Sequence, residues 1–218
     1  MIGIFGGTFD PVHYGHIKPA LYVKQALGLE QLCFVPNRSP PHRAEPWLSV
    51  EQRLQLLKAA LRVIADDSPE VVVDERELKR DGPSYMVDTL SSFKHDFPDE
   101  TLCLIIGMDA FFGITSWFKW RSLFELCHLV VIGRPGFDQN SIAHQFDSDD
   151  YAFIAPRITT NADALSAQGN GKILIQSVPQ LDISSTRIRD NLQHEEQMIQ
   201  WMPEQVYRIL RGFIDDDR

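Results

Sequence analysis

The chain has 218 residues, of which 44% are hydrophobic and 23% charged, a composition that is ordinary for a folded globular protein and excludes a disordered one. This length corresponds to about one domain and allows roughly 70% of the unfolded surface to be buried. The formal net charge of −9 argues against a broad nucleic-acid surface, so a site for an anionic ligand must gather its positive charge locally.

Membrane and secreted classes are also disfavoured. No apolar run approaches the roughly 18 residues needed to span a bilayer, and the N-terminus lacks a basic region followed by an apolar core and a cleavage site. We therefore expect a cytoplasmic protein with neither a membrane nor a nucleic acid as partner. The cysteines lie in or beside apolar strand-like runs without C-x-x-C spacing, which predicts buried reduced thiols; they are Cys33, Cys103 and Cys127.

The first predicted element is a strand that starts at Ile2 and breaks at Gly6 and Gly7. A helix is predicted to follow over Tyr14 to Leu27. A glycine turn between a strand and a helix suits phosphate, because the backbone can approach the ligand closely and the free N–H groups of the helix favour anions. The sequence therefore predicts a phosphate site at this turn.

Two histidines follow the glycine turn. His13 and His16 are three residues apart, so both imidazoles can face the same side of the first helical turn, where phosphates would lie. The glycines match neither G-x-G-x-x-G nor the P-loop pattern. Two alternatives stay open: a tight turn with two surface histidines, and a metal site in which Asp10 joins the imidazoles as in non-haem iron centres.

The second strand is predicted over Leu32 to Val35, and four prolines forbid regular structure in the segment from Pro36 to Pro46. A long, partly basic loop directly after a strand suggests a segment that closes over substrate. His42 and Arg43 could then reach a phosphate, with a solvated connector as the alternative.

A second helix begins with a capping box made by Ser49 and Gln52. Helical spacing predicts that its core-facing residues are Val50, Leu54, Leu57, Leu61 and Ile64. A third strand is predicted over Val71 to Val73. It is followed by a polar run and by a helix over Met86 to His95, which Ser84 can cap.

The fourth predicted strand, Leu102 to Ile106, is followed by Asp109. An acidic residue just beyond the carboxyl end of a strand lies where open α/β sheets bind ligands, and a helix N-cap is the alternative. The run from Phe111 to Leu126 is predicted to be helical. Trp117 could stack on a flat ring, whereas Trp120 has the spacing of a core residue.

The fifth strand is predicted over His128 to Ile132, and a turn after it carries Arg134. The pattern weakens from Phe137 to Gly171, which we interpret as a variable excursion. A sixth strand follows over Lys172 to Gln176, and a final amphipathic helix is predicted over Pro203 to Phe213, ahead of a solvated acidic tail.

Three hydroxyl residues open a helix before that final one. Ser184, Ser185 and Thr186 could form an anion site with the free N–H groups of the helix, and Arg187 and Arg189 would add charge. A simple helix cap would use one hydroxyl, so three hydroxyls followed by two arginines favour the anion site.

Strands alternate with helices along the whole chain, which predicts the α/β class with a Rossmann-like, doubly wound parallel sheet and right-handed crossovers. We expect a single domain over residues 1–218, with a small C-terminal helical portion at about 184–218.

Several motifs, in order, resemble those of the bacterial nicotinate-nucleotide adenylyltransferase family within the H-x-G-H nucleotidyltransferases. Besides Trp117 they are G-G-T-F-D-P-V-H-Y-G-H, P-P-H-R, E-L-K-R-D-G-P-S-Y, I-I-G-M-D, G-R-P-G and I-S-S-T-R-I-R. The resemblance implies transfer of AMP from ATP to nicotinate mononucleotide in NAD biosynthesis, with Mg²⁺, giving deamido-NAD and pyrophosphate. Assembly into a homo-oligomer stays open.

The resemblance also implies site residues. The catalytic group would be His13, His16 and Arg43. The ATP-binding residues would be Gly6, Gly7, Thr8, Phe9, His16, Asp109, Arg134, Ile183, Ser184, Ser185, Thr186 and Arg189. Nicotinate mononucleotide would contact Ser84, Tyr85, Met86, Asp109, Trp117 and Phe118.

One residue departs from the family pattern. The family usually has threonine where this chain has Met86. A contact through the backbone N–H would survive the change, whereas a hydroxyl contact would be lost. The other acceptors that stay open are nicotinamide mononucleotide, alone or with dual specificity, and phosphopantetheine. Outside this chemistry, a nucleotide-sensing module and a metal-dependent hydrolase built on Asp10, His13 and His16 are the alternatives.

Overall fold

The computed structural model describes residues 1–38, 45–64, 68–133, 139–179 and 181–216. Within these residues, seven parallel strands form one sheet in the order β3-β2-β1-β4-β5-β7-β6. The strands are β1 (Ile2–Gly7), β2 (Gln31–Pro36), β3 (Val71–Val73), β4 (Leu102–Gly107), β5 (His128–Gly133), β6 (Ile158–Thr159) and β7 (Ile173–Ser177). The predicted doubly wound parallel sheet is confirmed.

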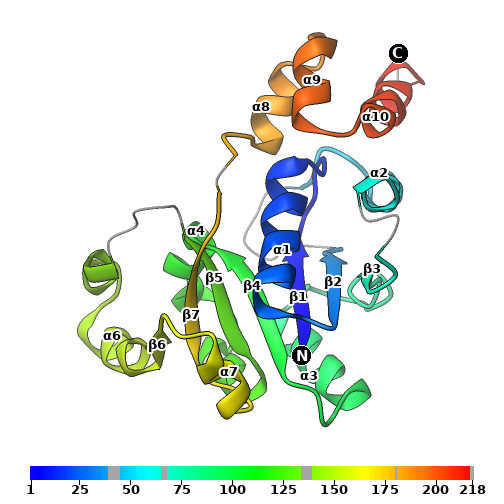
Figure 1. The fold of residues 1–218 in the computed structure, drawn as a ribbon. Helices are drawn as coiled ribbons and strands as arrows, with labels where there is room; N and C mark the ends of the chain where they lie inside the picture. Colours follow the sequence, from blue (N-terminus) through cyan, green and yellow to red (C-terminus); the bar gives the residue numbers. More distant parts are fainter. Residues whose placement is uncertain (39–44, 65–67, 134–138, 180, 217–218) are drawn as a thin grey trace.

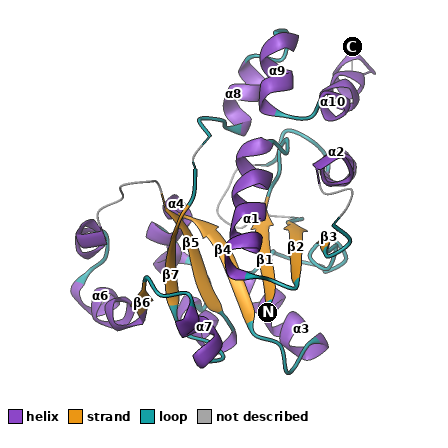
Figure 2. Cartoon of the chain, in the orientation of Figure 1, coloured by secondary structure: helices purple, strands orange, loops and turns teal. Residues whose placement is uncertain are grey.

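Helices lie on both faces of the sheet (Figure 2). The longer ones are α1 (Tyr14–Leu27), α2 (Val50–Ile64), α3 (Met86–Asp96) and α10 (Glu204–Asp216). The shorter ones are α4 (Met108–Phe112), α5 (Leu123–Leu126), α6 (Ser148–Ile154), α7 (Asp163–Ala167), α8 (Ser185–Asp190) and α9 (Glu195–Trp201). Short 3₁₀ helices cover Ile114–Ser116, Trp120–Ser122, Gln139–His144 and Ala155–Arg157.

Two hydrophobic clusters correspond to the two faces. Successive strand residues alternate between them, so that Ile4 packs with α3, α4 and α5, while Phe5 packs with α1, α2 and α10. The strand order reverses between β1 and β4, and the carboxyl ends of these two strands therefore flank the point where open α/β sheets bind ligands. Helices α8 to α10 lie beyond these strand ends, near the start of α1 (Figure 1).

The local predictions are largely confirmed. Helix α1 has the predicted bounds, and Gly28 ends it in the left-handed region at φ 59°. Both hydrogen bonds of the capping box are present, because the Ser49 N–H donates to Gln52 Oε1 at 2.9 Å and the Gln52 N–H donates to Ser49 Oγ at 3.2 Å. The three cysteines are buried and free, and burial raises the pKa of each thiol.

Two helix predictions are wrong. Tyr85, not Ser84, is the N-cap of α3, and its side chain makes no capping hydrogen bond; the Ser84 hydroxyl instead accepts from the Arg38 N–H at 3.2 Å. The continuous helix predicted over Phe111 to Leu126 is broken into α4, two 3₁₀ turns and α5. Lys119 has a positive φ of 50°, which a continuous helix cannot accommodate.

The core-facing side of α2 is only partly as predicted: Leu57 and Leu61 are buried, whereas Val50, Leu54 and Ile64 are half-buried. Its buried residues are Arg53, Leu56, Leu57, Ala60 and Leu61. The helix is therefore rotated relative to the face that the apolar spacing predicted. This rotation brings Arg53, an arginine, into the interior.

The C-terminal region contains more structure than predicted. Helix α9 was not predicted, because only Met198 and Trp201 are buried in it and two apolar residues do not establish a period. Helix α10 continues to Asp216, so the predicted solvated tail is partly helical. The described part of the excursion, residues 139–171, contains α6, β6 and α7. Across the described residues, the structure contains no helix with the length and apolar character of a membrane span.

Candidate active site

The turn after β1 is fixed from the inside by aromatic packing. Phe9 has a positive φ of 51° and is 1% exposed. Its ring packs against Phe5 and Phe34, with both centroid distances at 6.0 Å. A Cβ at Gly7 would lie 2.9 Å from this ring, so only glycine allows the backbone to pass there. The packing of Phe9 and the close approach at Gly7 therefore fix the backbone conformation of this turn.

The two histidines stack on each other at the start of α1. The ring centroids of His13 and His16 are 3.7 Å apart with an interplanar angle of 26°, and Phe9 meets His16 edge-on at 5.3 Å. A Cβ at Gly15 would lie 2.9 Å from His13 Nδ1 and 3.3 Å from the Ile183 carbonyl oxygen. The glycine of H-x-G-H therefore leaves room both for the His13 ring and for the segment that leads into α8.

Burial makes His13 unusual among histidines. The side chain is 4% exposed, and its Nδ1 is buried with no hydrogen-bond partner among the described residues. Burial, with a smaller contribution from neighbouring His16, lowers the pKa of His13 to about 2. His13 is therefore neutral in the free protein. An anion placed against the pair would favour the protonated form instead.

Asp10 connects three segments that are far apart in the sequence. Its carboxylate accepts from the N–H groups of Trp47 at 2.7 Å and Leu48 at 2.9 Å, just before α2. The Asp10 carbonyl oxygen accepts from Arg189 Nη1 at 2.6 Å, and the same guanidinium lies 3.7 Å from the carboxylate. These contacts occupy the carboxylate that the metal alternative requires. No cluster of three or more potential ligands occurs among the described residues.

Helix α8 is bound to this same turn. The Ser185 hydroxyl donates to the Pro11 carbonyl oxygen at 3.0 Å, across 174 residues of sequence. Ser184 caps the helix by accepting from the Arg187 N–H at 3.2 Å, and Thr186 Oγ1 accepts from Arg189 Nη2 at 3.1 Å. Of the three hydroxyls that the sequence assigned to an anion site, Ser185 therefore holds α8 against the first turn, while Ser184 and Thr186 bond to residues within α8.

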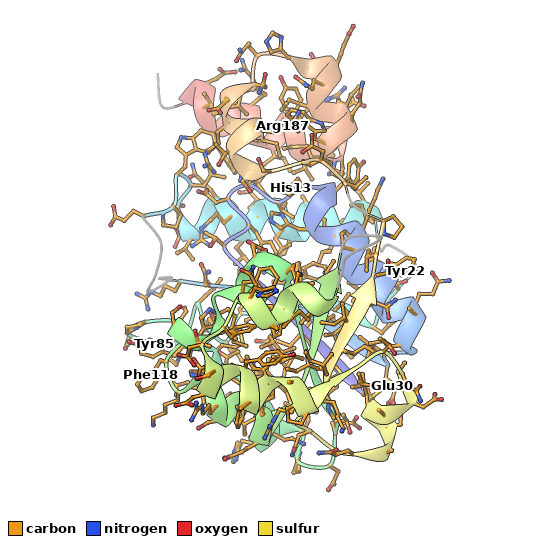
Figure 3. The ribbon with its side chains drawn as sticks, turned by 90° about the vertical axis from the view of Figure 1, so that its left-hand side faces the viewer. His13, Tyr22, Glu30, Tyr85, Phe118 and Arg187 are labelled. Carbon is orange, nitrogen blue, oxygen red and sulfur yellow. The ribbon has the colours of Figure 1, made fainter. Side chains whose placement is uncertain are left out.

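Arg187 is directed away from this cluster. Its Nη1 donates to the Asp182 carbonyl oxygen at 2.7 Å and pairs with the Asp182 carboxylate, and its guanidinium lies over the Trp201 ring at 5.0 Å. In Figure 3, Arg187 lies in the C-terminal helices just above His13. The expectation that Arg187 adds charge to the anion site is not met by these contacts.

The residues predicted for the mononucleotide lie at the start of α3 and after α4. The rings of Tyr85 and Phe118 face each other with centroids 4.6 Å apart (Figure 3), and Phe118 is 45% exposed. Trp117 is half-buried against the cluster on this face. A Cβ at Gly6 would lie 2.8 Å from Met86 Cε, so this segment adjoins the end of β1.

Of four further predicted residues, one is described by the structure and three lie outside the described residues. Asp109 is exposed in the first turn of α4, and a Cβ at Gly107 would lie 2.7 Å from Asp109 Oδ1. His42, Arg43 and Arg134 lie outside the described residues. Their roles stay predictions.

Two residues that contact the turn from other elements, Arg53 on α2 and Asn37 after β2, were missed by the sequence analysis. Arg53 is 1% exposed, and its Nη1 donates to the carbonyl oxygens of Thr8 at 2.8 Å and Asn37 at 2.9 Å. Asn37 Nδ2 donates to Thr8 Oγ1 at 3.2 Å. Burial lowers the pKa of Arg53, and the nearby Asp10 carboxylate opposes this effect. A polar residue in an amphipathic helix gives no sequence signal that it will point inward.

Comparison with known proteins decides the family. The cytidylyltransferase-like family model matches residues 4–191. The chain belongs to the cytidylyltransferase-like family. This match includes the first turn and α8, the two segments that Asp10 and Pro11 connect.

Relatives of this cytidylyltransferase-like chain are similar over nearly its whole length. A Methylococcus capsulatus protein named "Probable nicotinate-nucleotide adenylyltransferase" is 44% identical over 210 residues, 96% of each chain. A Halorhodospira halophila protein of the same name is 42% identical over 205 residues, 94% of this chain and 90% of the relative.

A solved structure shares the fold at low identity. The Plasmodium falciparum nicotinic acid mononucleotide adenylyltransferase, complexed with NaAD, superposes with a TM-score of 0.69 over 97% of this chain and 95% of that one, at 18% identity. The resemblance predicted from the motifs is confirmed.

The buried His13 predicts a pH-dependent stability. Because the unfolded chain binds a proton near pH 6.5 and the folded protein resists it down to about pH 2, the free energy of unfolding should fall as the pH drops below 6.5. The slope from this group is at most about 1.4 kcal/mol per pH unit. Urea unfolding at several pH values between neutral and mildly acidic measures it.

The matched control is the exposed His95. His13→Asn should flatten the decline in stability, whereas His95→Asn should leave it as in the wild type. Equal slopes in all three proteins would show that His13 is not held neutral by the fold.

Proposed function

We propose that the protein transfers an adenylyl group from ATP to nicotinate mononucleotide, releasing pyrophosphate and deamido-NAD. The observation that carries this proposal is the 44% identity, over 96% of both chains, with a relative named for this activity. The stacked histidines at the β1–α1 turn, with α8 bound beside them, support it with a site suited to polyphosphate.

The reaction requires mainly that the two substrates are aligned for in-line attack and that the negative charge of their phosphates is stabilised. A phosphate oxygen of the mononucleotide attacks the α-phosphorus of ATP, a new P–O–P bond forms, and the bond to the β-phosphate breaks as pyrophosphate leaves. No covalent protein intermediate is needed. Catalysis then depends on holding both substrates in line and on stabilising negative charge in the transition state.

The histidine pair would provide that stabilisation. His13 is neutral in the free protein because burial disfavours its charge. A triphosphate over the turn would favour the protonated form of His13, so this imidazole would become a better hydrogen-bond donor as negative charge develops, and His16, stacked on it, would face the same phosphates. Arg189, which already bonds to the Asp10 carbonyl oxygen, would add a fixed positive charge beside the turn.

Mg²⁺ would enter with ATP. Magnesium in nucleotide sites is held largely by phosphate oxygens and water, with one or two carboxylates. Asp109, exposed just beyond the carboxyl end of β4, is the carboxylate that the topology favours for this role or for the nucleotide itself. The reaction on soluble nucleotides fits a cytoplasmic protein.

The start of α3 favours an acid over an amide as acceptor. Tyr85 caps this helix without a side-chain hydrogen bond, which leaves the first N–H groups and the positive end of the helix dipole for a ligand carboxylate. Arg80 Nη2 lies 3.4 Å from the Tyr85 carbonyl oxygen and brings a further positive charge. Because Met86 would contribute its backbone N–H, the missing threonine hydroxyl does not remove this preference.

The direct test is pyrophosphate release from ATP and Mg²⁺ with nicotinate mononucleotide and nicotinamide mononucleotide in parallel. We expect the acid to be used at least about ten-fold faster per unit substrate, from charge at the α3 N-terminus. Equal rates would make the enzyme dual-specific. No release with either would overturn the proposal and favour another acceptor or a nucleotide sensor.

The role of His16 can be tested separately. We expect His16→Ala to lower turnover by about 10²-fold or more, the loss expected for a preorganised partner of the transition state. His95→Ala, an exposed histidine on α3, is the matched control and should turn over normally. A folded His16→Ala protein with near-normal turnover would exclude this role.

A further inference from the structure

Arg53 is the most unusual buried side chain outside the predicted site. It lies on α2 beside Leu56, Leu57 and Ala60, where an apolar residue would avoid the cost of burying a charge. Its Nη1 donates to two carbonyl oxygens, while Nε and Nη2 are buried with no partner among the described residues. If this side chain had only a structural role in the core, we would expect each of its polar atoms to have a hydrogen-bond partner, or an apolar residue to stand in its place.

The two acceptors belong to neighbouring strand ends. Thr8 follows β1 and Asn37 follows β2, and the last ladder bond between these strands runs from the Asn37 N–H to the Gly7 carbonyl oxygen at 3.0 Å. Beyond that bond, the Asn37 side chain donates to Thr8 Oγ1 at 3.2 Å. At the carboxyl ends of the two strands, the single Nη1 atom of Arg53 therefore bonds to both segments, through the Thr8 and Asn37 carbonyl oxygens.

Fixing a carbonyl also fixes the N–H of the same peptide, because the two point in opposite directions across a trans peptide plane. The Thr8 carbonyl points at Arg53, so the Phe9 N–H points away from α2, in the turn predicted to bind ATP. The Asn37 carbonyl also points at Arg53, and the Arg38 N–H on its far side donates to Ser84 Oγ at 3.2 Å. Ser84 belongs to the segment predicted to bind the mononucleotide.

We propose that Arg53 is a positioning residue that sets the alignment of the two substrate-binding segments, the turn at Thr8 and the segment at Ser84. This inference rests on the proposed function. Arg53 contacts carbonyl groups of the protein and acts through them. Because in-line transfer depends on relative placement more than on the affinity for either substrate, its loss should reduce kcat and leave both KM values nearly unchanged.

The test compares substitutions at two arginines of α2. Arg53→Met keeps the length of the side chain and removes the donor, and Arg62→Met makes the same change at an exposed position in the last turn. We expect Arg53→Met to lower kcat by about ten-fold or more, with both KM values within about three-fold of the wild type. Arg62→Met should match the wild type in both parameters.

Arg53→Lys tests the mechanism by rescue. One nitrogen of Arg53 serves both carbonyl groups, so a lysine ammonium can take its place between them. We expect this variant to recover most of the turnover lost in Arg53→Met. Circular dichroism and thermal melting of each variant establish the folded fraction, to which kcat is normalised.

Each outcome decides the inference. A lower melting temperature with normal kcat per folded molecule, or a raised KM for ATP with normal kcat, would overturn it. If Arg53→Met does not fold, Arg53→Gln replaces it, because the shorter amide side chain stays polar but does not extend as far as the guanidinium that bonds to the two carbonyl oxygens; a normal kcat per folded molecule would then overturn the inference. Failure of the wild type to release pyrophosphate would overturn the proposed function and this inference together.

Discussion

The contacts of Asp10 are the constraint on which the candidate site depends. Through its carboxylate and carbonyl oxygens, this residue binds the chain before α2 and the guanidinium of Arg189 on α8. Together with the bond from Arg53 to the Thr8 carbonyl oxygen and the bond from Ser185 to the Pro11 carbonyl oxygen, these bonds fix the first turn relative to α2 and α8. The sheet positions the turn that carries the histidine pair, and polar contacts at the carboxyl edge of the sheet hold α8 and the chain before α2 beside this turn.

This arrangement explains the electrostatics of the site. An acidic protein with a net charge of −9 must attract polyphosphate through local features. Burial, with a smaller contribution from His16 at a centroid distance of 3.7 Å, keeps His13 neutral in the free protein. Under the proposed function, a bound polyphosphate would favour the protonated form of His13 at the place where negative charge develops.

Features set by local sequence could be predicted, and those set by long-range packing could not. The glycine turn, the bounds of α1 and the capping box at Ser49 follow from residues within one or two turns of each other. The inward direction of Arg53 depends on how α2 rotates against the sheet. The bond from Ser185 to Pro11 spans 174 residues, which explains why the sequence suggested an anion site at α8 but not its structural contact with the first turn.

The proposed chemistry depends above all on polyphosphate binding over the stacked histidines. Nuclear magnetic resonance of ¹⁵N-labelled histidines, followed during a titration with ATP and Mg²⁺, tests it most directly. We expect the His13 and His16 imidazole signals to shift together on binding, and His13 then to titrate at a higher pH than in the free protein, while the His95 signal stays unchanged. Binding of ATP with unchanged His13 and His16 signals would show that the polyphosphate lies elsewhere.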